Sequence, residues 1–205
     1  AENCEMYAIA GRSMEKAEQF KEKYGFEKAY GSYEELLTDP EIEAVYIPLP
    51  NTMHYEWTIK ALKSGKHVLC EKPLAPTEAQ AKEMFAAAEE NHVYLMEAFA
   101  YQHSPYLTAI REEIKNGTIG DVRYMESAYI TSDYNKNNIR MRRDTLGGCT
   151  YDLGVYNTSL ILRTLAEEPT EIRAIASFSE EKIDKLTSVI MEYGDGKKAA
   201  FSCGM

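Results

Sequence analysis

The sequence predicts an α/β parallel sheet in its first half, followed by an α+β region with an open, mostly antiparallel sheet. Short runs with the composition of β-strands alternate with helical segments up to about residue 100, which is the pattern of a parallel sheet. Three further strand-like runs follow the last predicted helix, and the turn Gly194-Asp195-Gly196 separates the last two of them. Such a turn joins neighbouring antiparallel strands.

The first half contains four predicted strands and three predicted helices. The strands are expected at 4–11, 44–50, 67–73 and 93–99, and the helices at 13–25, 52–65 and 77–92. Gly25, Gly65 and Asn91 follow the last periodic residues of these helices, where left-handed residues usually end a helix.

The second half begins after one more helix, expected at 104–116. A long strand-like run at 121–134 and a loop rich in Asn and Arg follow it, so we predict one domain over 1–118 and another over 119–205. A final helix near 151–166 precedes strands expected at 171–180, 186–194 and 197–205. The chain ends inside this predicted sheet, so we expect a carboxyl-terminal portion to be missing.

The composition limits the possible partners. Hydrophobic residues make up 44% of the 205 residues and charged residues 27%, as in folded soluble proteins. The net charge of -10 argues against nucleic acid or an anionic membrane, because both require clustered Lys and Arg. No apolar segment is long enough to cross a bilayer and nothing resembles a secretory signal, so a cytoplasmic location is expected. The four cysteines are scattered without a CxxC pair, which predicts neither a metal site nor a disulfide framework.

The first predicted strand is unusual for a parallel sheet that binds a dinucleotide. Such a fold normally opens with a strand, a GxGxxG turn and a helix whose amino end holds the pyrophosphate. The chain contains no GxGxxG, and its opening strand instead resembles the second strand of a Rossmann-like sheet. The sequence therefore predicts a Rossmann-like domain that lacks its first strand, its glycine loop and its first helix.

Gly11, Arg12 and Ser13 occupy the end of that strand, where an acidic residue would hydrogen-bond the adenosine ribose of NAD. An arginine and a hydroxyl at this place can bind a 2'-phosphate instead, which favours NADP over NAD. The alternative is a solvated Arg12 beside a Ser13 that only caps the next helix.

Several polar residues follow the next predicted strands. Pro48 and Pro50 mark a tight loop at the carboxyl end of one strand, where ligands bind in open α/β sheets. Lys72 directly follows the next strand and can donate to a ribose or substrate hydroxyl. The alternatives are a surface lysine before a turn and, for His54, a packed or capping residue.

Four motifs in order, PNxxH, EKP, MEAF and GGxxYDxGxY, resemble the glucose-fructose oxidoreductase and inositol dehydrogenase family, often written Gfo/Idh/MocA. The likeness covers nearly the whole chain. Within the family, the motifs most resemble dimeric dihydrodiol dehydrogenases and NADP-linked sugar dehydrogenases. Four ordered motifs identify a family far better than any one of them alone.

The resemblance implies roles for individual residues. Lys72 matches the lysine that contacts the nicotinamide ribose and the substrate hydroxyl, Asp152 matches the aspartate that orients substrate, and Tyr156 matches the proton-transfer residue. Arg140 resembles an arginine that lines the substrate pocket, whereas Gln102 stands where the family often has an arginine. The implied cofactor-binding residues are Arg12, Ser13, Pro48, Leu49, Asn51, His54, Glu71 and Lys72.

Tyr156 suits the oxidation of a secondary alcohol, which needs a hydride acceptor and a group that removes the hydroxyl proton. The ordinary tyrosine pKa of about 10 is high for this task, so we expect the ammonium of Lys72 to lower it. Asp152 and Tyr156, four residues apart, should share one helical face. The alternative interpretation is a helix-start aspartate and one of fifteen tyrosines packed in the core.

The sequence thus predicts an NADP-dependent oxidoreductase that transfers hydride between nicotinamide and the CH–OH carbon of a sugar, cyclic polyol or diol. A homo-oligomer formed through the carboxyl-terminal sheet is expected. The competing hypotheses are a non-catalytic regulatory relative that senses a nucleotide or sugar, and a truncated chain that folds but is inactive.

Overall fold

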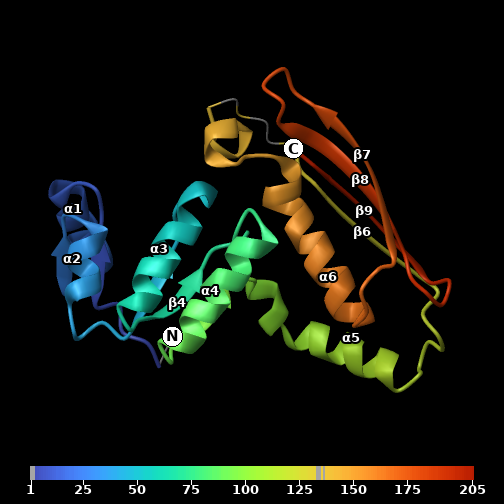
Figure 1. Cartoon of the computed structure of the whole chain (residues 1–205), viewed down its shortest axis with the longest axis horizontal. Coiled ribbons are helices and arrows are strands. Elements are labelled where there is room, and N and C mark those ends of the chain that lie inside the picture. The colour runs from blue at the N-terminus through green and yellow to red at the C-terminus, as the bar shows by residue number, and fades with distance from the viewer. Residues whose placement is uncertain (1–2, 133–134, 136) are drawn as a thin grey trace. The chain divides into compact units, whose positions relative to one another are not determined.

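The computed structural model describes residues 3–132, 135 and 137–205 (Figure 1). These residues form two compact units. The first comprises residues up to Pro48, Met53–Cys70 and Thr77–Met96, and the second comprises Leu49–Thr52, Glu71–Pro76 and Glu97–Met205. The helix expected at 104–116 therefore belongs to the second unit, although the predicted domain boundary lies near residue 118. The division into domains at 1–118 and 119–205 stays a prediction.

The first half of the chain alternates strands and helices as predicted. Its elements are β1 (Ala8–Ala10), α1 (Met14–Tyr24), β2 (Lys28–Tyr30), α2 (Tyr33–Thr38), β3 (Ala44–Ile47), α3 (Asn51–Lys63), β4 (His67–Cys70), α4 (Glu78–Glu90) and β5 (Leu95–Glu97). The sequence pattern missed β2 and α2, because three and six residues are too few to display a periodicity.

The parallel sheet of this half is divided. β1 pairs in parallel with β2, and β3, β4 and β5 form a separate sheet in that order. A Rossmann sheet has the strand order 3-2-1-4-5-6. The two partial sheets match strands 3-2 and 4-5-6 of this order, and the central strand 1 has no counterpart among the described residues. This agrees with the prediction that the first strand is lacking.

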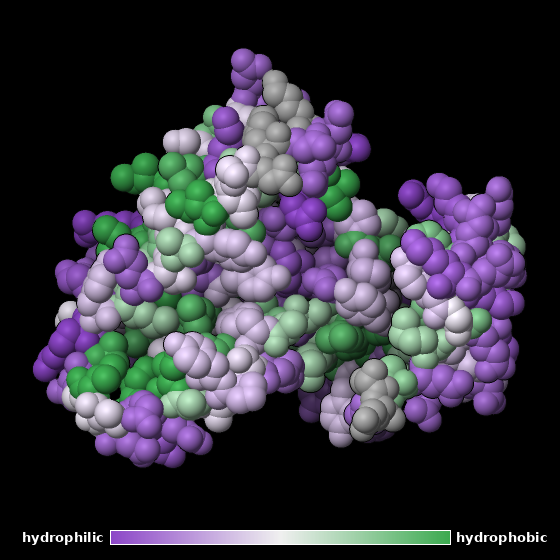
Figure 2. All heavy atoms as spheres, turned by 180° about the vertical axis from the view of Figure 1, so that it is seen from behind, coloured by the Kyte–Doolittle hydropathy of each residue, from purple (hydrophilic) through white to green (hydrophobic). Residues whose placement is uncertain are grey.

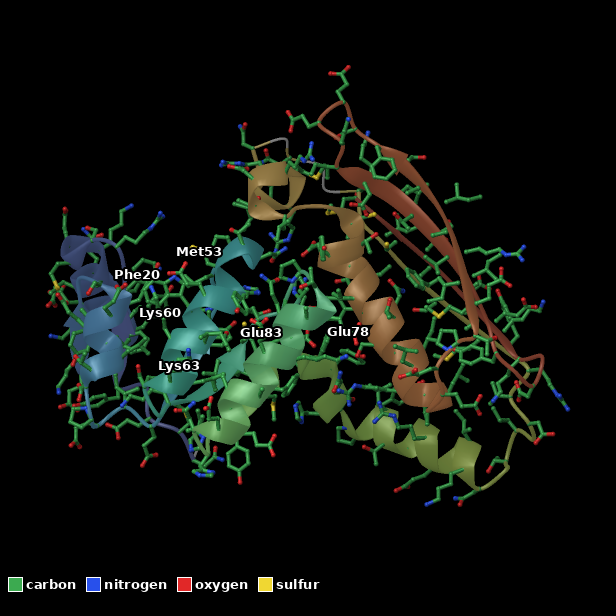
Figure 3. All side chains as sticks on the ribbon, viewed as in Figure 1. Phe20, Met53, Lys60, Lys63, Glu78 and Glu83 are labelled. Carbon is green, nitrogen blue, oxygen red and sulfur yellow. The ribbon has the colours of Figure 1, made fainter. Side chains whose placement is uncertain are left out.

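Backbone and side-chain hydrogen bonds end α1 and α4 of the first unit and join α3 to α4. Gly25 ends α1 in the left-handed conformation and donates its backbone N–H to Lys21. Asn91 was expected to do the same for α4, but its φ is -96°, and it instead donates its side-chain amide to the carbonyl of Ala87 at 2.8 Å. Tyr55 of α3 donates its hydroxyl to Glu83, which Figure 3 labels on α4.

The second unit contains the α-helices α5 and α6 and a four-stranded sheet. Its elements are η1 (Ala100–His103), α5 (Pro105–Lys115), β6 (Tyr124–Ile130), η2 (Ile139–Met141), η3 (Arg143–Thr145), a π-helix η4 (Thr150–Gly154), α6 (Val155–Leu165), β7 (Glu171–Phe178), β8 (Asp184–Glu192) and β9 (Lys198–Gly204). The strand order is β6-β9-β8-β7, with β6 and β9 parallel and the other neighbours antiparallel. The mostly antiparallel sheet is as predicted. Residues 133 and 134 of the expected strand at 121–134 lie outside the described residues.

One face of this sheet forms the core of the second unit. Figure 1 shows α6 lying along the sheet, and Ile161 of α6 and Leu153 of η4 are buried with inward-facing residues of β8 and β9. The opposite face carries exposed apolar side chains such as those of Ile175 and Ile190. Figure 2 shows green apolar groups among purple polar ones on the surface of the molecule seen from behind. No helix of the described chain is both long and apolar enough to span a membrane.

Candidate active site

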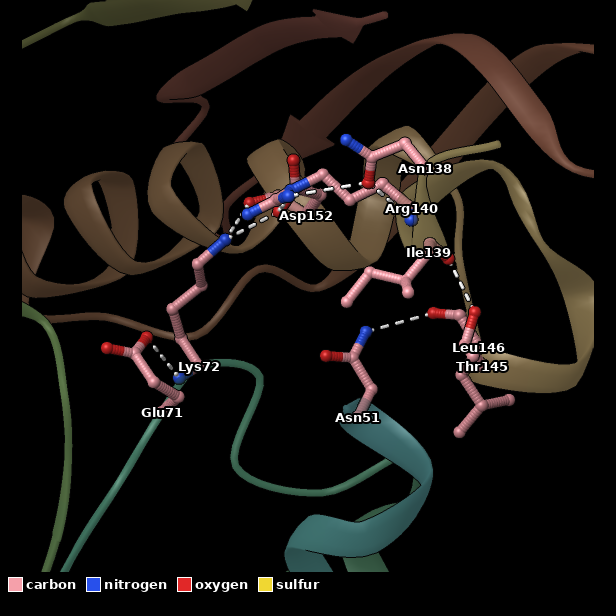
Figure 4. Close-up of polar contacts among 9 residues, drawn as sticks. All are labelled: Asn51, Glu71, Lys72, Asn138, Ile139, Arg140, Thr145, Leu146 and Asp152. Atoms are coloured by element: carbon pink, nitrogen blue, oxygen red, sulfur yellow. Dashed lines mark hydrogen bonds and ion pairs between the residues drawn. The ribbon is translucent and has the colours of Figure 1, made fainter. Parts of the chain in front are cut away.

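A partly buried ion pair joins the segment after β4 to the start of the last helix. Lys72 donates its ammonium to the Asp152 carboxylate oxygen Oδ1 at 2.8 Å and to the Asp152 backbone carbonyl at 2.6 Å (Figure 4). The Lys72 side chain is 11% exposed and that of Asp152 16%, so little water screens the pair. The structure therefore brings together two of the three predicted catalytic residues, which are 80 positions apart in the sequence.

Arg140 completes the surroundings of this carboxylate. Its Nε donates to the same Asp152 oxygen at 2.9 Å, and its Nη1 donates to Asn138. Arg140, the predicted substrate residue, thus contacts Asp152, a predicted catalytic residue. The sequence did not predict this contact, because the loop that carries Arg140 matches the family motif only loosely.

Two glycines let the backbone before the last helix lie close to Arg140 and Asp184. A Cβ at Gly147 would lie 2.2 Å from the Arg140 carbonyl oxygen, and a Cβ at Gly148 would lie 2.0 Å from the Asp184 carboxylate oxygen Oδ1. The backbone N–H of Gly148 also donates to the Arg140 carbonyl at 2.8 Å. Any side chain at either position would displace the Arg140 loop or the start of the helix.

Replacing Gly148 with Ala should destabilise this chain by more than the backbone strain of about 1–3 kcal/mol that its φ of +127° imposes on a non-glycine residue. The excess arises because the methyl group would overlap Asp184. Urea unfolding of the purified chain measures the loss. The matched control is Gly196→Ala, because Gly196 also has a positive φ of +85° but open space around its Cβ position. Equal losses for the two variants would refute the steric argument.

Tyr156 lies beside the ion pair within a group of aromatic rings. The ring centroids of Phe99, Tyr129 and Tyr101 are 5.5, 5.7 and 6.0 Å from that of Tyr156. The Lys72 ammonium lies over the Tyr156 ring, 4.9 Å from its centroid. Lys72 therefore contacts both Asp152 and Tyr156. The turn that carries Asp152 is a π-helix, whereas Tyr156 lies in the regular helix that follows it.

The charge environment of Tyr156 differs from the expectation. Burial raises the pKa of the Tyr156 phenol above 10.0, and the negative charge of Glu71 raises it further. Arg140 lowers it, but not enough to compensate. The expectation that Lys72 depresses this pKa is therefore wrong for this geometry, because burial and the negative charges of Glu71 and Asp152 dominate. The phenol is a proton donor at neutral pH.

The remaining predicted cofactor residues divide between the units. Arg12, Ser13, Pro48 and His54 belong to the first unit, where Arg12 is exposed at the end of β1 and His54 is fully buried in α3. Ser13 accepts a hydrogen bond from the Lys16 backbone N–H, so it does cap α1. A contact of Ser13 with the 2'-phosphate of NADP stays a prediction.

Leu49, Asn51 and Glu71 belong to the second unit with Lys72. Asn51 donates its side-chain amide to the Leu146 carbonyl at 3.0 Å, which ties the first turn of α3 to the loop that precedes Gly147. Glu71 accepts from the Lys72 backbone N–H at 3.3 Å (Figure 4). Both residues thus support the loops around Lys72.

A cavity of about 150 Å³ adjoins Tyr156. Its lining includes Tyr101 and Asn157, and each of these two residues has a buried oxygen without a hydrogen-bond partner among the described residues. Sequence reasoning missed Tyr101, Tyr129 and Asn157, because only packing reveals which of fifteen tyrosines surround Tyr156. Gln102, which departs from the family arginine, donates instead to Ser159 of α6 at 2.9 Å.

Metal ligation has no candidate residues in the described part of the chain, where no group of three His, Cys, Asp or Glu side chains could hold an ion. The chemistry that the described side chains offer is proton transfer beside a paired lysine and aspartate.

Comparison with known proteins matches the two halves of the chain to one family. The model of the GFO_IDH_MocA oxidoreductase family with an NAD-binding Rossmann fold matches residues 1–99, and the model of the GFO/IDH/MocA C-terminal domain matches residues 107–205. The uncharacterized oxidoreductase ORF334 of Rhizobium meliloti is 36% identical over 97% of this chain and 60% of its own length.

The relatives with described activities include a dehydrogenase and a ketoreductase. Trans-1,2-dihydrobenzene-1,2-diol dehydrogenase of Mus musculus is 35% identical over 98% of this chain and 60% of its own length. The solved structure of KijD10, a 3-ketoreductase from Actinomadura kijaniata in complex with NADP and TDP-benzene, has a TM-score of 0.89 at 32% identity, covering 98% of this chain and 62% of KijD10. The chain spans about 60% of the length of the curated relatives it matches.

Proposed function

Because this chain belongs to the Gfo/Idh/MocA family of oxidoreductases, we propose that the protein is an NADP-dependent dehydrogenase acting on the CH–OH carbon of a sugar, cyclic polyol or diol. One observation carries the proposal. The Lys72 ammonium contacts both the Asp152 carboxylate and the Tyr156 ring, so three groups suited to alcohol chemistry form one cluster.

Each member of the cluster has a distinct part in the proposed reaction. Tyr156 exchanges the hydroxyl proton of the substrate, since its phenol is the acid at neutral pH. Asp152 fixes the position of Lys72, and Lys72 holds the substrate oxygen close to the phenol. Arg140 fixes Asp152 from the other side at 2.9 Å.

NADP, when bound, supplies the hydride acceptor or donor. On the nicotinamide side, the pair of Lys72 and Glu71 fits a ribose, because an ammonium donates and a carboxylate accepts. On the adenosine side, exposed Arg12 beside Ser13 fits a 2'-phosphate, since a guanidinium binds phosphate with two parallel hydrogen bonds. The pyrophosphate has no GxGxxG cradle within this sequence.

The cavity beside Tyr156 supports a ring-shaped polar substrate. A volume of about 150 Å³ accepts one six-membered ring, as engineered cavities of this size bind benzene. Tyr101 and Asn157 line this cavity and add polar residues to it. Relatives named as a dihydrobenzenediol dehydrogenase and as a 3-ketoreductase are consistent with this class.

The test is a substrate panel. The protein expressed from its complete open reading frame is mixed with NADP and a set of sugars, cyclic polyols and diols, and reduced nicotinamide is recorded by absorbance. Turnover of at least one substrate is expected. A flat trace for every substrate, despite NADP binding measured by calorimetry, would favour the alternative of a regulatory relative that senses a nucleotide or sugar. The ion pair of Lys72 and Asp152 beside Tyr156 favours the enzyme. A protein that only senses a nucleotide or sugar would need no proton donor next to this pair.

The proposal includes a cytoplasmic location. It also includes a homo-oligomer that forms through the open face of the carboxyl-terminal sheet. Register pairs Arg173 with Ile190 and Ile175 with Ser188, so these side chains share the face opposite the core. Ile175 on this face is 82% exposed and Ile190 57% exposed. Large exposed apolar side chains on one sheet face are typical of an interface.

The double variant Ile175→Lys, Ile190→Lys should convert the oligomer to a monomer. The introduced ammonium groups would face either each other or apolar side chains across the interface, and both arrangements are unfavourable. Light scattering of the complete protein measures the mass. The matched control is Tyr94→Lys, an apolar residue 81% exposed in the other unit, which should leave the mass unchanged. A monomeric parent protein would contradict the interface.

A further inference from the structure

Asp184 is the first residue of β8, and its carboxylate binds the start of the helix that carries the proposed active site. Its Oδ2 accepts from the Thr150 backbone N–H at 2.8 Å and from the Cys149 thiol at 3.1 Å. The Thr187 hydroxyl of the same strand donates to it at 3.3 Å. These donors come from η4 and from the sheet, so one carboxylate joins the two.

The charge of Asp184 persists at this partly buried place. Burial by itself raises the pKa of the carboxyl, but hydrogen bonds from Thr150 and Cys149 outweigh it, so the pKa lies below its ordinary value. The carboxylate is therefore ionised at neutral pH and faces the amino end of a helix. An anion there is stabilised by the unpaired backbone N–H groups.

The contact between Asp184 and the start of η4 requires a glycine at position 148. Its φ is +127°, and a Cβ at this position would lie only 2.0 Å from Asp184 Oδ1, which leaves room for glycine alone. The sequence thus keeps the one residue type that lets the carboxylate reach Thr150.

The contact lies two residues from the catalytic cluster. Asp152 follows Thr150 in η4, and its backbone N–H donates to the Gly148 carbonyl at 3.0 Å. The backbone carbonyl of Asp152, not only its carboxylate, accepts from Lys72. A shift of this turn would therefore move both acceptors of the Lys72 ammonium at once.

We propose that Asp184 is a positioning residue for the active site: by holding the amino end of η4, it sets the place of Asp152 and through it the place of Lys72. Asp184 does not contact the Lys72, Asp152 and Tyr156 cluster in any described hydrogen bond. The proposal rests on the proposed function for its effect on turnover, but its effect on Lys72 can be measured without turnover.

The first experiment labels lysines of the 205-residue chain with an amine-acylating reagent and reads each site by mass spectrometry. Asp184→Ala should raise labelling of Lys72 severalfold and leave Lys197 unchanged, since Lys197 is 13% exposed and paired with Glu167 and Asp195. The matched control Asp195→Ala should raise labelling of Lys197 and leave Lys72 unchanged. Unchanged Lys72 labelling in Asp184→Ala, or equal increases at both lysines, would overturn the proposal.

The second experiment measures kinetics with the complete protein. Asp184→Ala should lower kcat by about 10- to 100-fold, as small misplacements of catalytic groups do, with NADP affinity unchanged. Asp184→Asn should recover part of the loss, because the amide oxygen still accepts from Thr150. A kcat within twofold of the parent for folded Asp184→Ala would overturn the proposal. An inactive parent would refute the proposed function instead, and the labelling result would still stand.

Discussion

Replacing Tyr156 with Phe in the complete protein is expected to lower kcat by about 10²- to 10⁴-fold, the range over which a positioned acid or base accelerates proton transfer. The substitution removes one hydroxyl and keeps the ring that packs against Phe99, Tyr101 and Tyr129. NADP affinity, measured by calorimetry, should therefore be unchanged. The rate is measured with the best substrate found in the panel.

The matched control is Tyr193→Phe. Tyr193 is 3% exposed in the sheet core of the same unit, and burial also raises the pKa of its phenol. Among the described residues its hydroxyl donates a hydrogen bond to the Met191 sulfur, away from the proposed active site, so the control should keep its kcat. Equal rates for Tyr156→Phe and the parent would remove Tyr156 from the proposed reaction.

The raised pKa of Tyr156 also sets the sign of the pH dependence. The proton is fully present below the pKa, which lies above the ordinary value of 10.0, and is lost as the pH rises through it. Ketone reduction, which consumes this proton, should keep a constant kcat through neutral pH and decline only in strong alkali. Alcohol oxidation should accelerate toward alkaline pH. A reductive kcat that falls between pH 6 and 8, about two to four units below the ordinary tyrosine pKa, would contradict the protonated phenol.

Adding a strand, a GxGxxG loop and a helix before Ala1 should strengthen NADP binding by at least about a hundredfold, because the loop and helix N-terminus supply the pyrophosphate site. The divided sheet is the structural reason: β1 and β3 each end a partial sheet, and an inserted central strand would pair with both. Tyr46 and Leu69, paired across β3 and β4, are exposed apolar residues that an added helix could cover. Calorimetric titration of both chains measures the difference.

Two variants of the extended chain complete this test. Replacing the second glycine of the added loop with Val should abolish the gain, since a side chain there blocks the approach of the pyrophosphate. Arg12→Ala should weaken NADP binding far more than NAD binding, because only NADP carries the 2'-phosphate. NADP affinity of the 205-residue chain equal to that of the extended chain would refute the need for the loop.

The sequence by itself predicted the fold class because its signals are local. Alternating strand and helix patterns, helix-ending residues such as Gly25 and the turn at 194–196 each depend on a few neighbouring residues. The ordered motifs likewise singled out Lys72, Asp152 and Tyr156. The short β2 and α2 escaped, since their few residues carry no periodic signal.

Only the tertiary structure decided how those residues meet. Lys72 and Asp152 are 80 positions apart, and Asp184 binds the helix start from 34 positions away. No local pattern specifies that the Lys72 ammonium lies over the Tyr156 ring, or that burial reverses the expected shift of the Tyr156 pKa. Contacts and desolvation depend on which distant surfaces pack together, so the chemistry of the site emerges only when the chain is folded.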